Sequence, residues 1–362
     1  MELSPLWLLS SKGDSLAVSV NLDNPLDHLD WDARLLSEGQ GSIFHSAAWA
    51  RVLVETYSFR PFYLTTDVCG SRLVVPIMEV SSWLTGRRGV SLPFTDECQL
   101  RIPPKGIPQL LDEALSLGRK QKWKYLEFRG CPGLRETTAG AQPSTAFYSH
   151  ALKVLSNSGQ LFSSFESPVR RAIRRGEKSG IRIDISRDSE ALRDFYRLHC
   201  ITRKKHGVPP QPFRFFLNIG KYILSQNLGM IVSAKYKRDT IAAAVFFRFG
   251  SEAVYKFGAS DPRFQDLRPN NLVIWKAIQH CAQNGISTLN FGRTNLLNEG
   301  LRRFKLGWGA EERTIEYHKF DFHEQSFVRS RDTLSGWQNK FFRVLPRFAS
   351  KWSGALFYRH IA

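Results

Sequence analysis

Seven polar side chains between residues 255 and 309 fall on turns and helix starts, where they could bind a charged ligand or stabilise a reaction intermediate. They are Asp261, Arg268, Asn270, Asn271, Arg293, Thr294 and Lys305. The apolar residues around them follow the spacing of a packed sheet and helix, so we expect the polar groups at the ends of these elements. Such an arrangement is typical of a ligand-binding cleft.

A helix is predicted to begin near Asn270. The preceding Arg268-Pro269 pair disfavours helix before the proline, and Asn270 can cap the N–H groups that follow. A helix start attracts anions through its dipole and its unpaired donors, so a phosphate, a pyrophosphate or an acyl oxyanion would suit it. The alternative is a capped helix start that binds only water.

Six motifs occur in order along roughly residues 40 to 320. They are 44–49 (FHSAAW), 82–88 (SWLTGRR) with 91–96 (SLPFTD), 257–261 (FGASD), 268–272 (RPNNL), 291–294 (FGRT) and the Phe304-Lys305 run. In this order they resemble the FemAB-like branch of the GNAT acyltransferase superfamily, especially the FemAB-like proteins found with exosortase and exopolysaccharide systems. No single motif is as diagnostic as a metal-binding cysteine pattern, but six in order are hard to match by chance.

The elements that must position these residues follow one plan in both halves of the chain. Each half has helix-like and strand-like segments, then an amphipathic helix (107–120 and 271–283) and a strand. Each helix-to-strand junction ends in a similar pattern, LEFRG at 126–130 and LNFGR at 289–293. We therefore predict an α/β (α+β) fold of tandem GNAT-like domains, each a mixed sheet flanked by helices. Two unrelated α/β units are the alternative.

The predicted boundaries are residues 1–160 for the first GNAT-like domain, 161–325 for the second and 326–362 for a basic amphipathic tail. In the tail, aromatic and aliphatic residues alternate with cations, so one face of a helix could lie in an anionic lipid interface. Pro346 would kink that helix, and packing on the body of the protein is the alternative.

The resemblance implies attack by an amine on an activated acyl carbon. Lys305 matches the lysine of the family's Phe-Lys motif, and we expect it to stabilise the oxyanion, with Arg293 as second choice. One such donor is worth about 3 kcal/mol. The alternative for both is surface ion pairing with Glu299, Glu311 or Glu312. The expected donor-binding residues are Phe304, Asn270, Asn271, Arg268 and Tyr255.

The general base is harder to assign. Asp96 closes the SLPFTD motif, and His206 lies in a predicted turn that could face the cleft, so either could take a proton. The substrate or a chain of waters could do so equally well. The nine histidines show no H-x-x-x-H or H-E-x-x-H spacing, so no metal site is expected.

A basic stripe between the halves is a further candidate site. Arg170, Arg174 and Lys178 share one helical face, and Arg171 and Arg175 lie beside it. The resemblance implies that this basic helix contacts the acceptor or the donor. We assign Arg170, Arg171, Arg174 and, from the predicted turn, His206 to binding the acceptor or another polyanion. The alternative for the stripe is a solvated helix, because charge runs usually face water.

Composition narrows the cellular setting. The 362 residues carry a net charge of +18, which favours anionic partners such as RNA, nucleotide-linked substrates or a membrane face. The five cysteines are scattered without C-x-x-C spacing, which argues against disulfides and structural zinc and predicts a reducing compartment. The first residues lack the charge pattern of a signal peptide, and no window approaches about 20 apolar residues. We expect the bacterial cytoplasm, with peripheral contact at the inner membrane face; the bacterial source rests on the resemblance.

Together these features predict transfer of an acyl or aminoacyl group to an amine on a cell-envelope or exopolysaccharide precursor. The donor would be acyl-CoA or aminoacyl-tRNA, with no permanently bound cofactor. The chain lacks the coiled-coil insertion of the FemA-type peptidoglycan enzymes, and it also lacks the pyrophosphate loop of ordinary GNAT enzymes, so the donor stays open. The alternative is a GNAT-like scaffold without catalysis in envelope polysaccharide assembly. A nucleic-acid regulator is a third class, but no groove-reading element is recognisable.

Overall fold

The computed structural model describes residues 19–39, 41–68, 71–98 and 106–329, together with Tyr358 and His360. Cys69 and nearly all of the predicted tail beyond residue 329 lie outside the described residues, and so does the predicted membrane contact of that tail.

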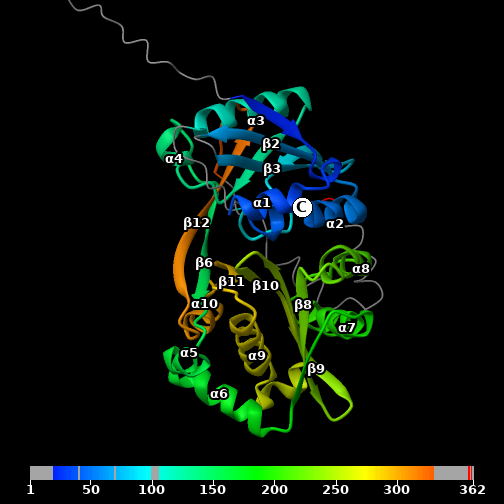
Figure 1. Ribbon diagram of the computed structural model, residues 1–362. Coiled ribbons are helices and arrows are strands. Elements are labelled where there is room, and N and C mark those ends of the chain that lie inside the picture. Colours follow the sequence, from blue (N-terminus) through cyan, green and yellow to red (C-terminus); the bar gives the residue numbers. More distant parts are fainter. Residues whose placement is uncertain are drawn as a thin grey trace, which may run out of the picture.

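One continuous 13-stranded sheet runs through the molecule, in the order β1-β2-β3-β4-β5-β12-β6-β11-β10-β9-β8-β7, with β13 paired to β12 (Figure 1). The strands are β1 Val20–Asp23, β2 Arg60–Val68, β3 Ser71–Ser82, β4 Gly86–Val90, β5 Tyr125–Arg129, β6 Thr145–Lys153, β7 Arg182–Ser186, β8 Gly229–Tyr236, β9 Asp239–Phe249, β10 Glu252–Ser260, β11 Thr288–Asn295, β12 Glu311–Asp321 and β13 Ser326–Phe327.

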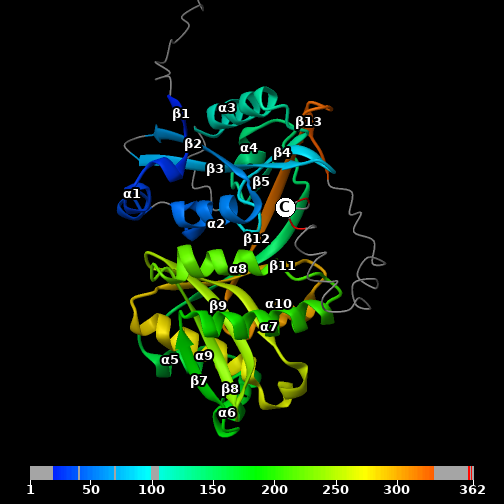
Figure 2. The same cartoon turned by 90° about the vertical axis from the view of Figure 1, so that its right-hand side faces the viewer.

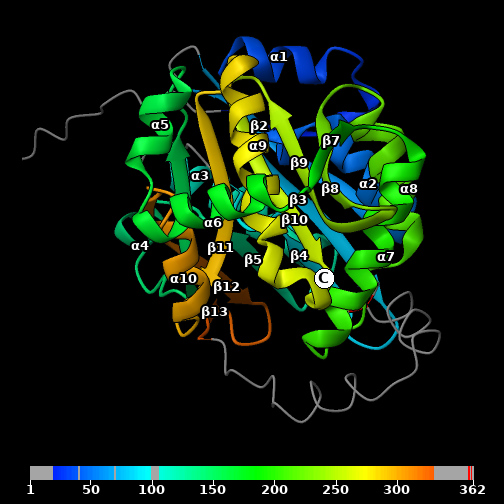
Figure 3. The same ribbon diagram turned by 90° about the horizontal axis from the view of Figure 1, so that it is seen from below.

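Helices cover both faces of this sheet. The α-helices are α1 Trp31–Ser37, α2 Ala47–Tyr57, α3 Ile107–Lys120, α4 Leu134–Thr137, α5 Ser158–Ser164, α6 Ser167–Lys178, α7 Ser189–Lys205, α8 Phe213–Ile219, α9 Pro269–Gln283 and α10 Glu299–Leu306. The 3-10 helices are η1 Pro25–Asp27, η2 Ile43–His45 and η5 Pro262–Leu267, and η4 Gly220–Leu224 is a π-helix that continues α8. Seen from below, α5, α6, α9 and α10 lie on one side of the C-terminal strands, and α7 and α8 lie on the other (Figure 3).

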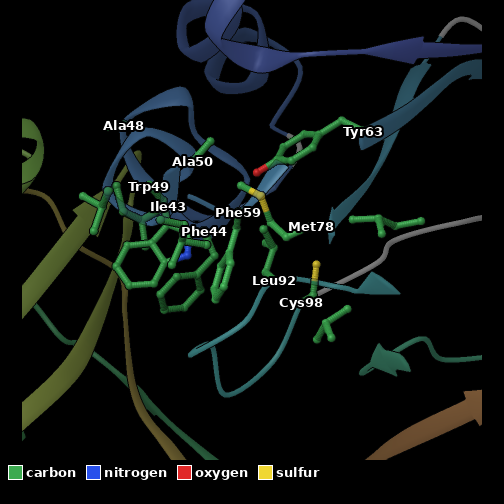
Figure 4. Close-up of a cluster of buried hydrophobic side chains, with 14 of the residues drawn as sticks. Ile43, Phe44, Ala48, Trp49, Ala50, Phe59, Tyr63, Met78, Leu92 and Cys98 are labelled. Carbon is green, nitrogen blue, oxygen red and sulfur yellow. The ribbon is translucent and has the colours of Figure 1, made fainter. Parts of the chain in front are cut away.

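Two buried clusters account for this layering, because alternate residues of a strand face opposite sides. Of the β9 residues, Val245 and Phe247 belong to the cluster that α2, α7 and α8 cover, while Ala244 and Phe246 belong to the cluster under α6 and α9. The first cluster continues into the N-terminal half, where Trp49 is fully buried among the apolar residues that follow η2 (Figure 4).

The repeated plan predicted from the sequence is visible in the strand pairing. In each half an α-helix joins two parallel strands, α3 between β4 and β5 and α9 between β10 and β11. The halves also share strands, since β12 pairs with both β5 and β6, and β6 pairs with β11. These pairings between the two halves make a single sheet. The predicted division of the chain into domains stays a prediction.

The parallel pair β10 and β11 is short. Its register runs only from Glu252, opposite Thr288, to Val254, opposite Asn290. Just beyond it, the pairing of β10 with β9 shifts between Tyr255 and Phe257. A β-bulge bends a strand and increases its twist, so the bulge turns β10 away from β11. The registered pairing of the two strands ends at Val254 and Asn290, two residues before Gly292.

Several predicted elements agree closely with the structure, and two local assignments are wrong. Helix 107–120 is found with the predicted bounds. Asn270 is not the cap of α9, because the helix already begins at Pro269 with Arg268 at the N-cap position. Lys305 lies in the last turn of α10, where a helix start was predicted. In both cases the helix begins earlier in the sequence than predicted. Pro269 can occupy the first position of α9, so the N-cap is Arg268. The side chain of Asn298 caps the start of α10.

Candidate active site

A groove of about 800 Å³ opens between α6, the start of α9 and α10. Its lining residues are Glu166, Pro168, Val169, Arg171, Ala172, Arg175, Arg268, Asn271, Gly300, Arg303, Phe304 and Gly307. Four of them are arginines and one is a glutamate, so the groove is strongly positive. Guanidinium groups are well suited to phosphate, because they present several N–H donors in a fixed plane.

The start of α9 adds backbone donors to this groove. Arg268 adopts a left-handed conformation with φ of 58°, and no side chain caps the helix. The N–H groups of Asn270 and Asn271 lie ahead of the first helical hydrogen bond, which runs from Leu272 N to the Arg268 carbonyl at 3.3 Å. Asn271 lines the groove, whereas the Asn270 side chain donates to Ser260 Oγ at 3.1 Å.

The basic stripe is divided by the geometry of α6. Arg171 and Arg175 line the groove. Arg170 turns back onto the preceding segment and donates to the Ser163 carbonyl at 2.9 Å, and Arg174 lies over the Phe162 ring at 5.4 Å. Of the three stripe arginines predicted to contact the acceptor, the structure therefore brings only Arg171 to the groove.

His206 lies away from this groove. It is the C-cap of α7, which covers the other face of the sheet from α6 and α9 (Figure 3). Tyr255 is also absent from the groove lining, because its ring packs between Phe246 and Phe291 at centroid distances of 5.3 and 6.3 Å. Burial raises the pKa of Tyr255 to about 12, which keeps its hydroxyl protonated.

A second group of charged residues surrounds Asp96, in the loop after β4. Asp96 Oδ2 lies 3.8 Å from Lys256 Nζ on β10, and its Oδ1 lies 3.7 Å from Arg293 Nε on β11. Burial alone would raise the pKa of Asp96, but the positive charges around it outweigh burial and hold that pKa below its ordinary value. These charges belong to Lys256, Arg293, Lys305 and Arg129.

Gly292 lets the Asp96 carboxylate come this close to β11. Its φ is +72°, and a Cβ at this position would lie 2.6 Å from Asp96 Oδ2. Any other residue would both strain the backbone and push the carboxylate away. The first half has a counterpart in Gly130, with φ of +76°, where a Cβ would lie 2.6 Å from Glu97 Cγ. The neighbouring carboxylates of Asp96 and Glu97 thus pack on the glycines of the two repeated junctions, Gly292 and Gly130.

Arg293 is held in place by aromatic residues. Its guanidinium lies 4.4 Å from the centre of the Phe147 ring and donates to the Tyr317 hydroxyl at 2.8 Å. The Tyr317 hydroxyl in turn donates to the Asp96 carbonyl. The Arg293 side chain is 37% exposed, so it remains accessible to a ligand while its orientation is fixed.

Lys305 is buried, with 3% of its surface exposed. Its ammonium donates to the carbonyls of Gly292 at 2.8 Å and Arg293 at 3.0 Å. Burial lowers its pKa to about 8, although Asp96 acts in the opposite direction. The surface ion pair predicted as the alternative for Lys305 is made by Arg302 instead, whose Nε lies 2.8 Å from Glu312 Oε2. Lys305 thus fixes the end of β11, while the adjacent Phe304 lines the groove.

A small pocket of about 20 Å³ adjoins Asp96 and Glu97, with Ser149 and Asn290 in its lining. This volume fits one water molecule. Glu97 binds Arg313 at 2.6 Å, yet burial outweighs that partner and raises the pKa of the carboxyl. The site therefore pairs a carboxylate held ionised with one that is easier to protonate.

The sequence did not point to several residues of these two sites. Lys256, Arg129, Tyr317 and Arg303 were not predicted as site residues, because they lie on four different elements and only the fold brings them to these sites. Only the arginine content of the 300–309 run could have indicated Arg303. Within the described ranges, no three His, Cys, Asp or Glu side chains gather as metal ligands would. In the same part of the chain, no helix has the length and apolar character that a membrane span requires.

Comparison with known proteins places this geometry in a wider context. The crystal structure of FemX is similar with a TM-score of 0.66 at 15% identity, covering 84% of this chain and 98% of FemX. L-PGS from Bacillus licheniformis has a TM-score of 0.52 at 14% identity, covering 86% of this chain and 95% of that one. At these identities the likeness concerns the fold alone.

A further similar structure is the C-terminal domain of a putative lysylphosphatidylglycerol synthetase from Agrobacterium fabrum, with a TM-score of 0.50 at 14% identity, covering 79% of this chain and 90% of that one. No curated protein sequence matches this chain. Residues 163–319 match the family described as acetyltransferase (GNAT) domain, and they include β10, β11, α9, α10 and the groove. The fold is therefore GNAT-like, a mixed sheet flanked by helices, and the match to the GNAT domain lies in its C-terminal half.

Proposed function

We propose that this protein transfers an acyl or aminoacyl group from a phosphate-bearing donor to an amine on a cell-envelope or exopolysaccharide precursor. The observation that carries the proposal is the four-arginine groove at the start of α9, inside the segment that matches the GNAT domain. The donor's phosphates would lie against Arg171, Arg175, Arg268 and Arg303. Its acyl end would reach the place where β10 and β11 separate.

The groove and the Asp96 cluster are linked through α10. Phe304 lines the groove, and the next residue, Lys305, donates to the carbonyls of Gly292 and Arg293. In the proposed reaction the acceptor nitrogen forms a bond to the acyl carbon, and the bond from that carbon to the donor's sulfur or oxygen breaks. The proton released by the amine neutralises the departing group. Most of the rate gain would come from positioning the two reactants.

Asp96 and Arg293 take different roles in this proposal. A carboxylate with a lowered pKa is a poor proton acceptor, so we assign Asp96 the orientation of the acceptor amine. Arg293 is fixed by Tyr317 and partly exposed, which suits it to the oxyanion of the tetrahedral intermediate. Lys305 acts through the backbone that it holds. The acceptor class rests on the resemblance to FemAB-like proteins, and the aminoacyl option also on a fold shared with a protein named L-PGS.

The groove is tested by a matched pair of charge reversals on α6. Arg171→Glu should weaken donor binding by tenfold or more, because it reverses a charge in the groove lining, whereas Arg170→Glu reverses a charge outside that lining. Binding of acetyl-CoA and of a charged tRNA would be measured by titration at two salt concentrations. Equal affinities for the two variants, or no binding of either donor by the unmodified protein, would refute the assignment.

Product analysis separates a transferase from a binding protein. With the donor that binds and a panel of amine-bearing envelope precursors, mass spectrometry should detect the acylated amine. A scaffold without catalysis would bind the donor and form no product.

A further inference from the structure

The turn between β3 and β4 carries two large apolar side chains that are mostly exposed, and the Trp83 ring meets the His360 ring edge-on at a centroid distance of 5.7 Å. Trp83 is 82% exposed and Leu84 is 63% exposed. They belong to the SWLTGRR motif, which neither the groove nor the Asp96 cluster uses. Folded proteins tolerate single exposed apolar residues, but a neighbouring tryptophan and leucine at a hairpin tip form a compact projecting surface.

The tip is held rigidly. Ser82 Oγ accepts hydrogen bonds from the N–H groups of Leu84 at 3.1 Å and Thr85 at 2.9 Å, which closes the turn. Below it, Arg88 donates to Thr85 Oγ1 at 2.7 Å and to the carbonyl of His360 at 2.8 Å. The turn is thus fixed from inside by buried polar groups. Because the turn is already rigid, Trp83 and Leu84 lose less conformational entropy when they bind a partner.

Two exposed cationic side chains flank this tip. Arg87 is exposed beside it, and the exposed Lys124 lies against the turn, where a Cβ on Gly86 would be 2.5 Å from Lys124 Cε. Tryptophan prefers the boundary between lipid and water, and lysine and arginine near that boundary bind anionic headgroups.

We propose that the β3–β4 hairpin is a docking surface for an anionic phospholipid membrane. Trp83 and Leu84 enter the interfacial region, while Arg87 and Lys124 contact lipid phosphates. We choose a lipid surface as the partner because both parts of the hairpin match it. The apolar tip suits the apolar side of the interface, and the cations beside the tip suit the anionic headgroups. The net charge of +18 adds long-range attraction to such a surface.

The experiment uses the full-length protein and sedimented vesicles of phosphatidylcholine alone or with one quarter phosphatidylglycerol. We expect binding to the phosphatidylglycerol vesicles that is weaker by tenfold or more in a Trp83→Ser, Leu84→Ser variant. Arg87→Gln with Lys124→Gln should also weaken it, by about fivefold for each charge removed. Because all four side chains lie at the surface, circular dichroism should show unchanged folding.

Leu29 supplies the matched control. It is 107% exposed, but in the sequence it lies among acidic residues just before α1. Figure 2 shows α1 and β4 on opposite sides of the N-terminal half. Leu29→Ser should bind vesicles like the unmodified protein. The proposal is overturned if the hairpin variants bind as well as this control, which would assign any membrane contact to another segment. It is also overturned if the unmodified protein does not bind the anionic vesicles.

Discussion

Replacing Gly292 by alanine tests whether the position of Asp96 controls activity. The substitution has two separable effects. First, alanine must adopt the left-handed conformation at φ of +72°, which costs about 1–2 kcal/mol of folding free energy. Second, its Cβ would lie 2.6 Å from Asp96 Oδ2, so the carboxylate must retreat by about 1 Å to reach ordinary contact.

The second effect acts on the site. A retreat of that size changes the distances from the Asp96 carboxylate to Lys256 Nζ and Arg293 Nε, which are 3.8 and 3.7 Å in the unmodified protein. Overpacking of this kind lowers the free energy of unfolding by a further 1–3 kcal/mol, roughly. We therefore expect Gly292→Ala to lose about 2–5 kcal/mol of stability. A displacement of about 1 Å in a positioned catalytic group can lower turnover about a hundredfold.

Gly285→Ala isolates the backbone effect. Gly285 has φ of +73°, and no atom of the described residues comes within 4 Å of the point that an alanine Cβ would occupy, so only the first effect applies. The free energy of unfolding from urea titration and the kcat of acyl transfer would be measured for both variants. We expect both to lose stability and only Gly292→Ala to lose most of its turnover. Equal kcat values in the two variants would refute a catalytic role for the Asp96 position.

Two further predictions concern the neighbours of Asp96. The pKa of Lys305 is about 8 in the folded protein, compared with an ordinary value of 10.5. Between pH 8 and 10.5 the unfolded chain therefore binds more protons than the folded protein does. The free energy of unfolding rises with pH across this window, by up to about 3 kcal/mol. Urea titrations at pH 7.5 and 9.5 should show this rise in the unmodified protein. The Lys305→Met variant should show no such rise, and its kcat should fall by a larger factor than its folding equilibrium constant. An equal change of stability with pH in the two proteins would contradict the buried charge. Tyr317→Phe removes the hydroxyl that joins Arg293 to the Asp96 carbonyl, so it should lose about 1–3 kcal/mol of stability and reduce kcat. Unchanged kcat in that variant would show that Arg293 needs no such support.

The sequence determined most of what is local. Amphipathic helices such as 107–120 were predicted with their bounds, because apolar periodicity depends on neighbouring residues alone. The repeated junctions that contain Gly130 and Gly292 were also visible, since the same strand and turn requirements recur in both halves. The sequence placed Arg268, Asn271 and Phe304 in a donor site, and these three residues do line one groove.

Only the tertiary structure decided which charges meet. Asp96, Lys256 and Arg293 come from a loop and two strands that are far apart in the sequence, and no local pattern records their approach. The same holds for α6, where periodicity grouped the arginines but only packing against α9 and α10 selected Arg171 over Arg170. Short-range patterns fix helices and strands, whereas the pairing of β12 with both β5 and β6 depends on long-range contacts that join the two halves into one sheet.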